Sequence, residues 1–331
     1  MRRDRPMTEV LDARAPTREG VLRAAGKIAR LLPPTPLIPV RIGGATVWAK
    51  AECLQPIGAF KIRGAWHRIS DLGEEERARG VVGVSSGNHA QGVAWAARQL
   101  GIRATIVMPS NAPQVKLERT RALGAEVVLY DRASGDRDEI AARLVAQGGA
   151  TLVHAYADPW VIEGQGSAAI ELAEQLERQA GGPPSRIVAP CGGGGLSAGL
   201  ALACPDAEIV PVEPQGWDVI GRSLAQDQAL RASPDAPATI CDCLLAPVAR
   251  EINLAVLRER AVPGLTVTDA EVRAAMRFAF AHLRLVVEPG AAAGLAAALA
   301  GKVPVDGRTV IMLTGGNVDA ARFAEVLASA D

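Results

Sequence analysis

The sequence predicts an α/β protein made of two lobes with a cleft between them. Short apolar, β-rich runs alternate with helical stretches of about 10 to 15 residues, the pattern of βαβ units on a parallel sheet. The chain has 331 residues, of which 49% are hydrophobic, and this exceeds the usual size of one domain. Linker-like composition at 180–185 and 232–248 interrupts the alternation, and no repeat of fixed period is present.

The first series of elements is expected between residues 80 and 156. Its strands are predicted at 80–86, 104–109, 125–131 and 151–156, and its helices at 89–100, 114–123 and 137–146. Gly101 and Gly124 follow the first two helices, and glycine ends helices readily because it adopts the left-handed conformation. Strand, helix, strand in this order predicts neighbouring parallel strands.

The second series is expected from residue 162 onwards. Its helices are predicted at 162–179, 196–203, 268–283, 291–300 and 319–328, and its strands at 186–190, 208–214 and 309–314. Ligands of open α/β sheets bind beyond the carboxyl ends of the strands. Candidate site residues are therefore expected in the segments that follow strands.

Composition excludes several partners. The 36 basic and 36 acidic residues give a net charge of zero, so there is no electrostatic reason to expect nucleic acid or an anionic membrane as partner. The five cysteines form no paired C-x-x-C framework, so we expect reduced thiols in a cytoplasmic protein. Residues 1–14 lack the apolar stretch of a signal peptide, and no apolar run of about 18 residues predicts a membrane span.

Lysine is scarce, and Lys61 has an unusual context. The other lysines are Lys27, Lys50, Lys116 and Lys302. Lys27, Lys116 and Lys302 lie in polar contexts predicted as helix surface or loop, and Lys50 ends a strand-like run. Lys61 lies in QPIGAFKIRGA (55–65), between an apolar run and a glycine-flanked turn. A partly desolvated lysine has a lowered pKa and becomes a nucleophile and base, whereas a surface charge is the simpler alternative.

The glycine run CGGGGLSAG (191–199) predicts an anion site. It follows a predicted strand and opens a predicted helix, so its backbone N–H groups converge, and phosphate is the expected ligand. A dinucleotide site stays open as an alternative, because Gly193, Gly195 and Ala198 fit G-x-G-x-x-A and Glu213 ends the next strand. That alternative leaves Lys61 without a role.

Two further polar loops follow predicted strands. SSGNHAQG (85–92) places Ser86, Asn88 and several N–H groups at a helix N-terminus, where they can hold a carboxylate. Simple N-capping by serine and asparagine is the alternative. TGGN (314–317) places the Thr314 hydroxyl at the end of the strand TVIML.

These motifs together resemble the fold-type II pyridoxal-phosphate enzymes, in particular the serine/threonine dehydratase and serine racemase group. The resemblance extends from TPLIPV (35–40) through TGGNVDAARF (314–323). It is carried, in order, by KAECLQPIGAFKIRGA, SSGNHAQG, GGGGLSAG, VEPQG and LTGGN. The resemblance implies a two-lobed architecture like that of the tryptophan synthase β subunit, with mostly parallel twisted sheets flanked by helices.

The resemblance also implies site roles. Lys61 forms the Schiff base with pyridoxal 5'-phosphate and works on the substrate Cα proton, and Ser86 matches the second base of racemases. The implied cofactor-binding residues are Phe60, Lys61, Asn88, Gly192, Gly193, Gly194, Gly195, Leu196, Glu288 and Thr314. The implied substrate-binding residues are Ser85, Ser86, Gly87, Asn88 and His89. Thr314 stands where most relatives have serine, and its hydroxyl faces the ring nitrogen.

The implied activity is β-elimination from a small β-hydroxy amino acid such as L-serine or L-threonine, giving a 2-oxo acid and ammonia. A serine-type racemase is the alternative, and an NAD-dependent oxidoreductase is a remote one. A hydroxyaspartate substrate would need a basic partner in the pocket, and the sequence identifies none. A large cofactor-binding domain is expected over 20–70 and 158–331, a small substrate-closing domain over 71–157, and a homodimer as the assembly.

A divalent cation (Mg, Mn or Ca) is the second implied cofactor. Many relatives bind it through the glutamate of a VEP segment, here Glu213, and an aspartate six residues later. Val219 occupies that later position, and Asp218 lies one residue early. Ala59 is a further departure, because it replaces a serine common before the Phe-Lys pair.

Overall fold

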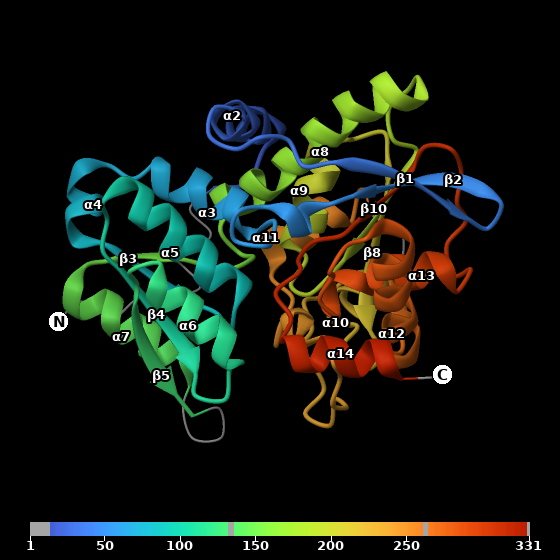
Figure 1. Cartoon of the computed structure of the whole chain (residues 1–331). Helices are drawn as coiled ribbons and strands as arrows, with labels where there is room; N and C mark the ends of the chain where they lie inside the picture. The colour runs from blue at the N-terminus through green and yellow to red at the C-terminus, as the bar shows by residue number, and fades with distance from the viewer. Residues whose placement is uncertain (1–13, 132–135, 261–263, 330–331) are drawn as a thin grey trace.

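The computed structural model describes residues 14–131, 136–260 and 264–329. Two sheets form two lobes that lie side by side (Figure 1). The large lobe contains a six-stranded sheet of order β1-β2-β10-β7-β8-β9, and the small lobe a four-stranded sheet of order β5-β4-β3-β6. The predicted α/β class with mostly parallel sheets is confirmed.

The small lobe is a parallel sheet with helices packed on it. Its strands are β3 (Val81–Val84), β4 (Ala104–Pro109), β5 (Glu126–Tyr130) and β6 (Thr151–Val153), and all neighbours pair in parallel. Its helices are α4 (Glu74–Arg79), α5 (Asn88–Leu100), α6 (Gln114–Ala122) and α7 (Arg137–Gly148). β3 and β6 end two and three residues earlier than predicted, because the chain turns there into loops that face the other lobe.

The large lobe adds an antiparallel hairpin that the sequence did not predict in full. β1 (Leu37–Ile42) pairs antiparallel with β2 (Ala45–Lys50) across a tight turn in which Gly43 and Gly44 have positive φ. The remaining strands are parallel, namely β7 (Arg186–Pro190), β8 (Glu208–Pro214), β9 (Leu265–Val267) and β10 (Thr309–Met312). Only the strand-like run that ends at Lys50 was visible in the sequence, because β1 alternates weakly and contains a proline.

Nine α-helices accompany the large-lobe sheet within the described ranges. They are α2 (Arg18–Ala29), α3 (Lys61–Ser70), α8 (Pro159–Ala180), α9 (Gly195–Ala203), α10 (Val219–Ala225), α11 (Glu251–Leu257), α12 (Asp269–Phe278), α13 (Ala293–Leu299) and α14 (Ala320–Ala328). The helix predicted at 268–283 is interrupted: α12 gives way to a π-helical turn, η3 (Ala279–Leu283), before Arg284 with φ +59°. The short helices η1 (Glu52–Leu54), η2 (Asp242–Leu244) and η4 (Gly290–Ala292) lie in loops.

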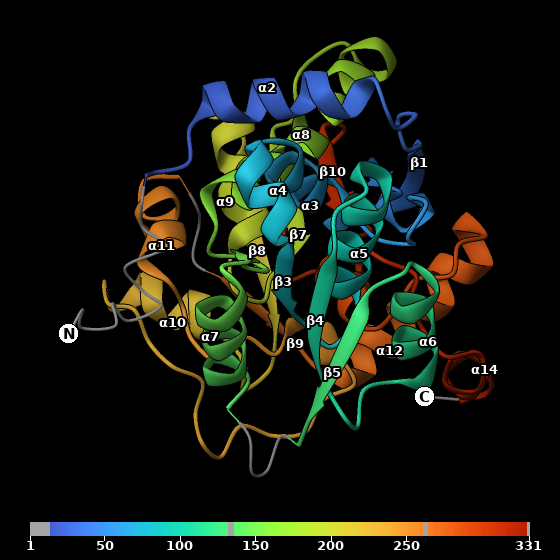
Figure 2. The same cartoon turned by 90° about the vertical axis from the view of Figure 1, so that its left-hand side faces the viewer.

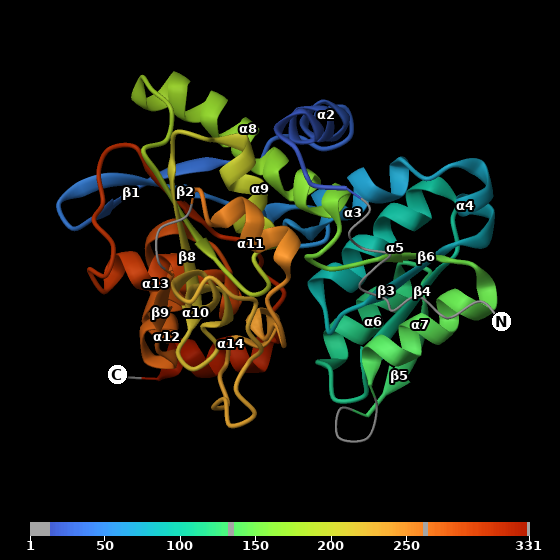
Figure 3. The same cartoon turned by 180° about the vertical axis from the view of Figure 1, so that it is seen from behind.

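The core is divided in the same way as the sheets. Two buried clusters cover the two faces of the six-stranded sheet, and a third fills the small lobe. α2 lies across the molecule next to α8 (Figure 2). In the view from behind, α3 lies between the lobes (Figure 3), and its residues Ala65 and Ile69 belong to the small-lobe cluster. The packing thus crosses the predicted boundary at residue 70, and the domain assignment stays a prediction.

No helix in the described parts of the chain is both long and apolar enough to cross a membrane.

Candidate active site

One pocket brings together most of the residues predicted for the site. The predicted residues that line it are Phe60, Lys61, Ser85, Ser86, Gly87, Asn88, His89, Gly192, Gly193, Gly194, Gly195, Leu196 and Thr314. They come from both lobes, from α3, the loops after β3 and β7, and the end of β10. Of the predicted set, Glu288 and Glu213 do not line the pocket.

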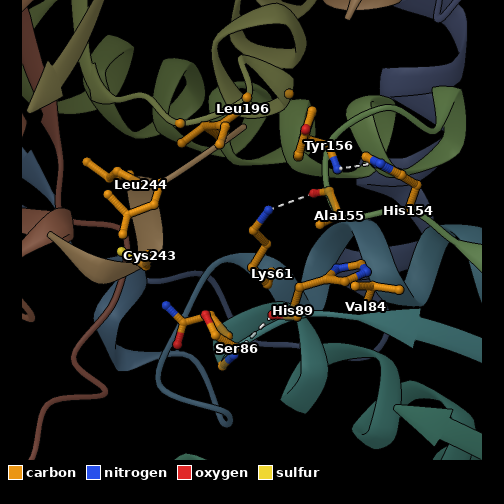
Figure 4. Close-up of a pocket in the computed structure, with 18 of the residues that line it drawn as sticks. Lys61, Val84, Ser86, His89, His154, Ala155, Tyr156, Leu196, Cys243 and Leu244 are labelled. Atoms are coloured by element: carbon orange, nitrogen blue, oxygen red, sulfur yellow. Dashed lines mark hydrogen bonds between the residues drawn. The ribbon is translucent and has the colours of Figure 1, made fainter. Parts of the chain in front are cut away.

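Lys61 projects into the centre of this pocket from the first position of α3 (Figure 4). Its Nζ donates to the carbonyl oxygen of Ala155 at 2.7 Å and lies 5.1 Å from the centre of the Phe60 ring. Burial lowers the pKa of Lys61 to about 8. The amine is therefore partly neutral near physiological pH, which is the state that attacks a carbonyl or accepts a proton.

Two other lysines are more deeply buried than Lys61, and one prediction about them was wrong. Lys50 is fully buried at the end of β2, where it donates to Glu171. Lys116 was expected on a polar helix surface, yet it is 2% exposed and lines the pocket. Its Nζ lies 3.0 Å from Asp242 Oδ2 and 3.5 Å from Glu288 Oε2. Carboxylates from a distant part of the chain make this burial tolerable, and local sequence does not reveal them.

The glycine run forms a cradle suited to phosphate. Gly194 has φ +84° and caps α9, so the first N–H groups of that helix have no partner within it. A Cβ on Gly193 would come within 2.3 Å of the Tyr156 ring, so a larger residue would fill the cradle. Ser197 on the first turn of α9 has a buried Oγ without a hydrogen-bond partner and lines the same pocket. Converging donors and an unpaired hydroxyl fit a phosphate group.

The loop after β3 offers a second set of donors at the start of α5. Ser85 Oγ accepts from the N–H of Gly87 at 3.0 Å, which fixes the turn into the helix. His89 Nε2 and the Val153 carbonyl oxygen are 2.8 Å apart, and burial lowers the pKa of His89 to about 3. His89 is therefore neutral and donates to Val153, so its ring braces β6 while the loop faces the pocket.

Asn88 and Thr314 are far in sequence from the glycine cradle residues, yet line the same pocket. Asn88 Nδ2 donates to Glu288 Oε1 at 2.5 Å, and Asn88 Oδ1 accepts from Asn317 at 2.8 Å. The carbonyl oxygen of Thr314 accepts from the N–H of Phe60 at 3.0 Å, which ties the end of β10 to the residue before Lys61. Glu288 thus reaches the pocket through Asn88.

Several pocket residues were missed by the sequence analysis. They are Lys116, Arg137, His154, Tyr156, Asp242 and Cys243. His154 and Tyr156 follow β6, but the sequence analysis placed them inside the strand predicted at 151–156, so the rule that sites lie after strands did not mark them. Arg137 begins α7, which no motif marked. η2 carries Asp242 and Cys243, and the spacing Cys241-x-Cys243 did not predict a place in this pocket.

Glu213 is a helix cap in this structure. Its Oε1 accepts from the N–H of Ile220 and its Oε2 from the N–H of Gly221, each at 2.8 Å, and burial raises its pKa to about 8. Val219 is buried beside it. Among the described residues, no group of three His, Cys, Asp or Glu side chains lies around Glu213, so the structure shows no completed cation site there. Glu213 as a metal ligand stays a prediction that no contact in the described structure supports.

Comparison with known proteins identifies the family of this chain. Residues 28–315 match the family described as pyridoxal-phosphate dependent enzymes. The chain is similar to an L-threo-3-hydroxyaspartate ammonia-lyase of Pseudomonas sp, with 41% identity over 93% of this chain and 97% of that protein. It is similar to an L-threo-3-hydroxyaspartate ammonia-lyase of Saccharomyces cerevisiae, with 38% identity over 94% and 96%. The solved structure of maize serine racemase aligns with a TM-score of 0.86 and 34% identity, over 94% and 97%.

The family match spans Lys61 and the glycine run together, so the dinucleotide alternative is set aside. Pyridoxal 5'-phosphate is the cofactor of the family, and the pocket offers it an amine and a phosphate cradle. The chain therefore belongs to the fold-type II pyridoxal-phosphate-dependent enzymes, in the group of ammonia-lyases and serine racemases.

Proposed function

We propose that the protein is an ammonia-lyase that removes water from a β-hydroxy amino acid and releases a 2-oxo acid and ammonia, and that 3-hydroxyaspartate is its preferred substrate. L-Serine and L-threonine are the smaller substrates expected from the sequence. The relatives with 38% and 41% identity are named for 3-hydroxyaspartate. The observation that carries the choice is the basic side chain of Arg137 in the pocket.

The side chains have separable tasks in this proposal. When bound, the cofactor supplies the electron sink that makes the substrate Cα–H acidic. Lys61 accepts and holds that proton at Nζ, since its lowered pKa keeps a neutral amine available. The N–H groups at the start of α5, after Ser86, bind the substrate α-carboxylate, and the cradle at 192–196 binds the cofactor phosphate.

Arg137 is the partner for a second carboxylate. It stands at the first position of α7 and lines the pocket, in a helix turn that also carries Asp138 and Glu139. Its side chain is 30% exposed and forms an ion pair with the adjacent Asp138 at 3.7 Å, a contact longer than a hydrogen bond, so its N–H groups can still bind another carboxylate. A guanidinium binds carboxylate with two parallel hydrogen bonds, which gives a dicarboxylic substrate an advantage over serine.

The test is a substrate panel with the cofactor-loaded enzyme. L-threo-3-hydroxyaspartate, L-serine and L-threonine are compared by release of oxo acid and ammonia. We expect the highest kcat/KM for hydroxyaspartate and loss of all elimination, by several orders of magnitude, in Lys61→Ala. Lys302→Ala is the matched control on the surface. Equal or better turnover of serine and threonine would contradict the substrate assignment, and elimination by Lys61→Ala would contradict the mechanism.

Racemisation is the second candidate activity. Ser86 lines the pocket together with Lys61 but comes from a different lobe, so a hydroxyl and an amine are available from separate elements (Figure 4). Chiral analysis of the amino acid recovered from the same reactions separates the two activities, because racemisation returns the enantiomer and elimination consumes the substrate.

A further inference from the structure

Two cations of α6 hold the ends of a polar chain that runs through Asn88. Asn88 Nδ2 donates to Glu288 Oε1 at 2.5 Å, and Asn317 Nδ2 donates to Asn88 Oδ1 at 2.8 Å. Lys116 Nζ lies 3.5 Å from Glu288 Oε2, and Arg119 Nη1 donates to Asn317 Oδ1 at 2.7 Å. Lys116 and Arg119 are three residues apart on one helix, so they project from neighbouring positions.

Every link of this chain joins the two lobes. Asn88 starts α5, and Lys116 and Arg119 belong to α6, all in the small lobe. Glu288 and Asn317 belong to the large lobe, in the loops before η4 and after β10. Figure 1 shows α6 on the side of the small lobe that faces the large lobe. The complete chain therefore exists only when α6 is docked against the large lobe.

Burial makes the Lys116 contact energetically important. Glu288 is 1% exposed and Lys116 2%. Burial raises the pKa of Glu288, while the ammonium of Lys116 acts in the opposite direction, and Asp242 adds a second negative charge. Burial alone would lower the pKa of Lys116, but Glu288 and Asp242 raise it. Without Lys116 the carboxylates would be left as uncompensated buried charge, which is strongly unfavourable.

The chain also determines what Asn88 can offer a ligand. A side-chain amide has two N–H donors and one oxygen. Glu288 takes one N–H and Asn317 occupies the oxygen, which leaves one N–H of Asn88 for a molecule in the pocket that Asn88 lines. An amide held at both sides cannot flip, so its remaining donor has a fixed direction.

We propose that Lys116 and Arg119 are positioning residues: by holding Glu288 and Asn317, they couple docking of α6 on the large lobe to the orientation of the Asn88 amide toward the cofactor. This inference rests on the proposed use of the pocket for pyridoxal 5'-phosphate. It does not depend on which amino acid is turned over.

Cofactor binding by the apoenzyme is the decisive measurement. For Lys116→Met we expect the Kd for pyridoxal 5'-phosphate to rise at least about tenfold, equivalent to about 1.4 kcal/mol. We expect a changed absorbance spectrum of the bound cofactor and faster hydrogen exchange in α6 and at the start of α5. Lys116→Arg keeps the charge and is expected to stay close to wild type. Arg119 is exposed, so Arg119→Gln should leave folding intact. We expect this variant to raise the Kd by a smaller factor than Lys116→Met.

A double variant that removes both charges of the Lys116–Glu288 pair provides an internal control. The double variant Lys116→Met/Glu288→Gln removes the cation and its partner charge together, so we expect it to bind cofactor better than Lys116→Met alone. Lys302→Met, which breaks the surface pair with Glu271, is the matched control and is expected to bind like wild type. Wild-type affinity, spectrum and exchange in Lys116→Met would overturn the inference. Failure to turn over hydroxyaspartate would instead contradict the proposed substrate and leave these measurements unaffected.

Discussion

Lys50 and Lys116 are buried and Lys61 is half-buried, and the three differ in what surrounds the amine. Lys50 donates to Glu171, and Lys116 lies within reach of Asp242 and Glu288. The hydrogen bond of Lys61 Nζ goes to the neutral carbonyl of Ala155. Burial beside a neutral acceptor destabilises the charged form, whereas a carboxylate restores it. Carboxylates raise the pKa of Lys116, and Lys50, whose pKa burial lowers, does not line the pocket. Lys61 is therefore the lysine that combines a lowered pKa with a place in the pocket.

The lowered pKa of Lys61 predicts how fast the apoenzyme takes up its cofactor at each pH. Only the neutral amine attacks the cofactor aldehyde, so the rate is expected to rise as the pH passes through about 8, more than two pH units below an ordinary lysine. The rate of cofactor uptake is followed by stopped-flow absorbance at about ten pH values between pH 6 and 10, and the pH at which the rate reaches half its maximum is the midpoint. A midpoint above about 10 would show that the amine is solvated like a surface lysine.

Arg137→Gln tests recognition of the second carboxylate. Removing the guanidinium should raise KM for 3-hydroxyaspartate about tenfold or more, because a charge-assisted pair is lost. Turnover of L-serine, which has no second carboxylate, is expected to change little. Arg143→Gln removes an exposed arginine from the same helix and serves as control. An equal loss with both substrates would assign Arg137 to the fold of α7 instead.

At the scale of the elements, a buried ionic cluster holds α3 in position. Arg63, two residues after Lys61, is 1% exposed and donates from Nε and Nη2 to both oxygens of Glu52 at 2.7 Å. Nη2 also donates to Glu171 Oε2 at 2.9 Å. Since Glu52 precedes α3 and Glu171 lies on α8, the cluster sets the position of the helix that carries Lys61.

Arg63→Met should destabilise the protein because Glu52 would be left buried without its partner. We expect a loss of about 3–5 kcal/mol in the free energy of unfolding, measured by denaturant titration. The control is Arg41→Met on the exposed face of β1, for which a change within about 0.5 kcal/mol is expected. A loss as small as that of the control would show that the cluster contributes little to the stability of α3.

The start of α10 provides a test of the Glu213 cap. Glu213→Gln retains one acceptor oxygen, so one of the N–H groups of Ile220 and Gly221 loses its partner. The expected cost is about 1–3 kcal/mol, and Glu208→Gln, at the half-buried first position of the same strand, is the control and removes only the charge of a partly exposed ion pair with Arg186. We also expect Tm of the wild-type holoenzyme to be the same with chelator and with Mg²⁺. A rise in Tm with Mg²⁺ that Glu213→Gln abolishes would establish Glu213 as a ligand.

At the scale of the whole molecule, exposed apolar side chains suit the homodimer expected from the resemblance, which we propose as the assembly. Leu54, Phe280 and Val286 are 53%, 44% and 45% exposed. The segments of Leu54 and Val286 both pack against Gly316. A Cβ added to Gly316 would lie 3.5 Å from Cys53 Cβ and 2.7 Å from the Val286 carbonyl oxygen. Large exposed apolar groups that lie together commonly mark an interface.

Light scattering after size exclusion tests this assembly. We expect a mass of twice 34.4 kDa for the wild-type chain and of one chain for Val286→Asp, because a charge in an apolar interface is costly to bury. Leu129→Asp changes an exposed leucine of the small lobe and is expected to leave the mass unchanged. A monomeric wild type would refute the homodimer.

The sequence by itself determined the α/β class, most strands to within three residues, and the residues of the amine, the glycine cradle and the two polar loops. These features follow from local patterns: the alternation of apolar residues, glycine runs between a strand and a helix, and polar residues after strands. Only the tertiary structure decided which charged side chains are buried and which groups they contact. Lys116 resembled a surface residue but is buried, the contacts of Glu213 with the start of α10 were not predicted, and Arg137 carried no motif. Whether a charge is buried, paired or free depends on partners more than 100 residues away for Lys116, and such partners leave no mark on the local sequence.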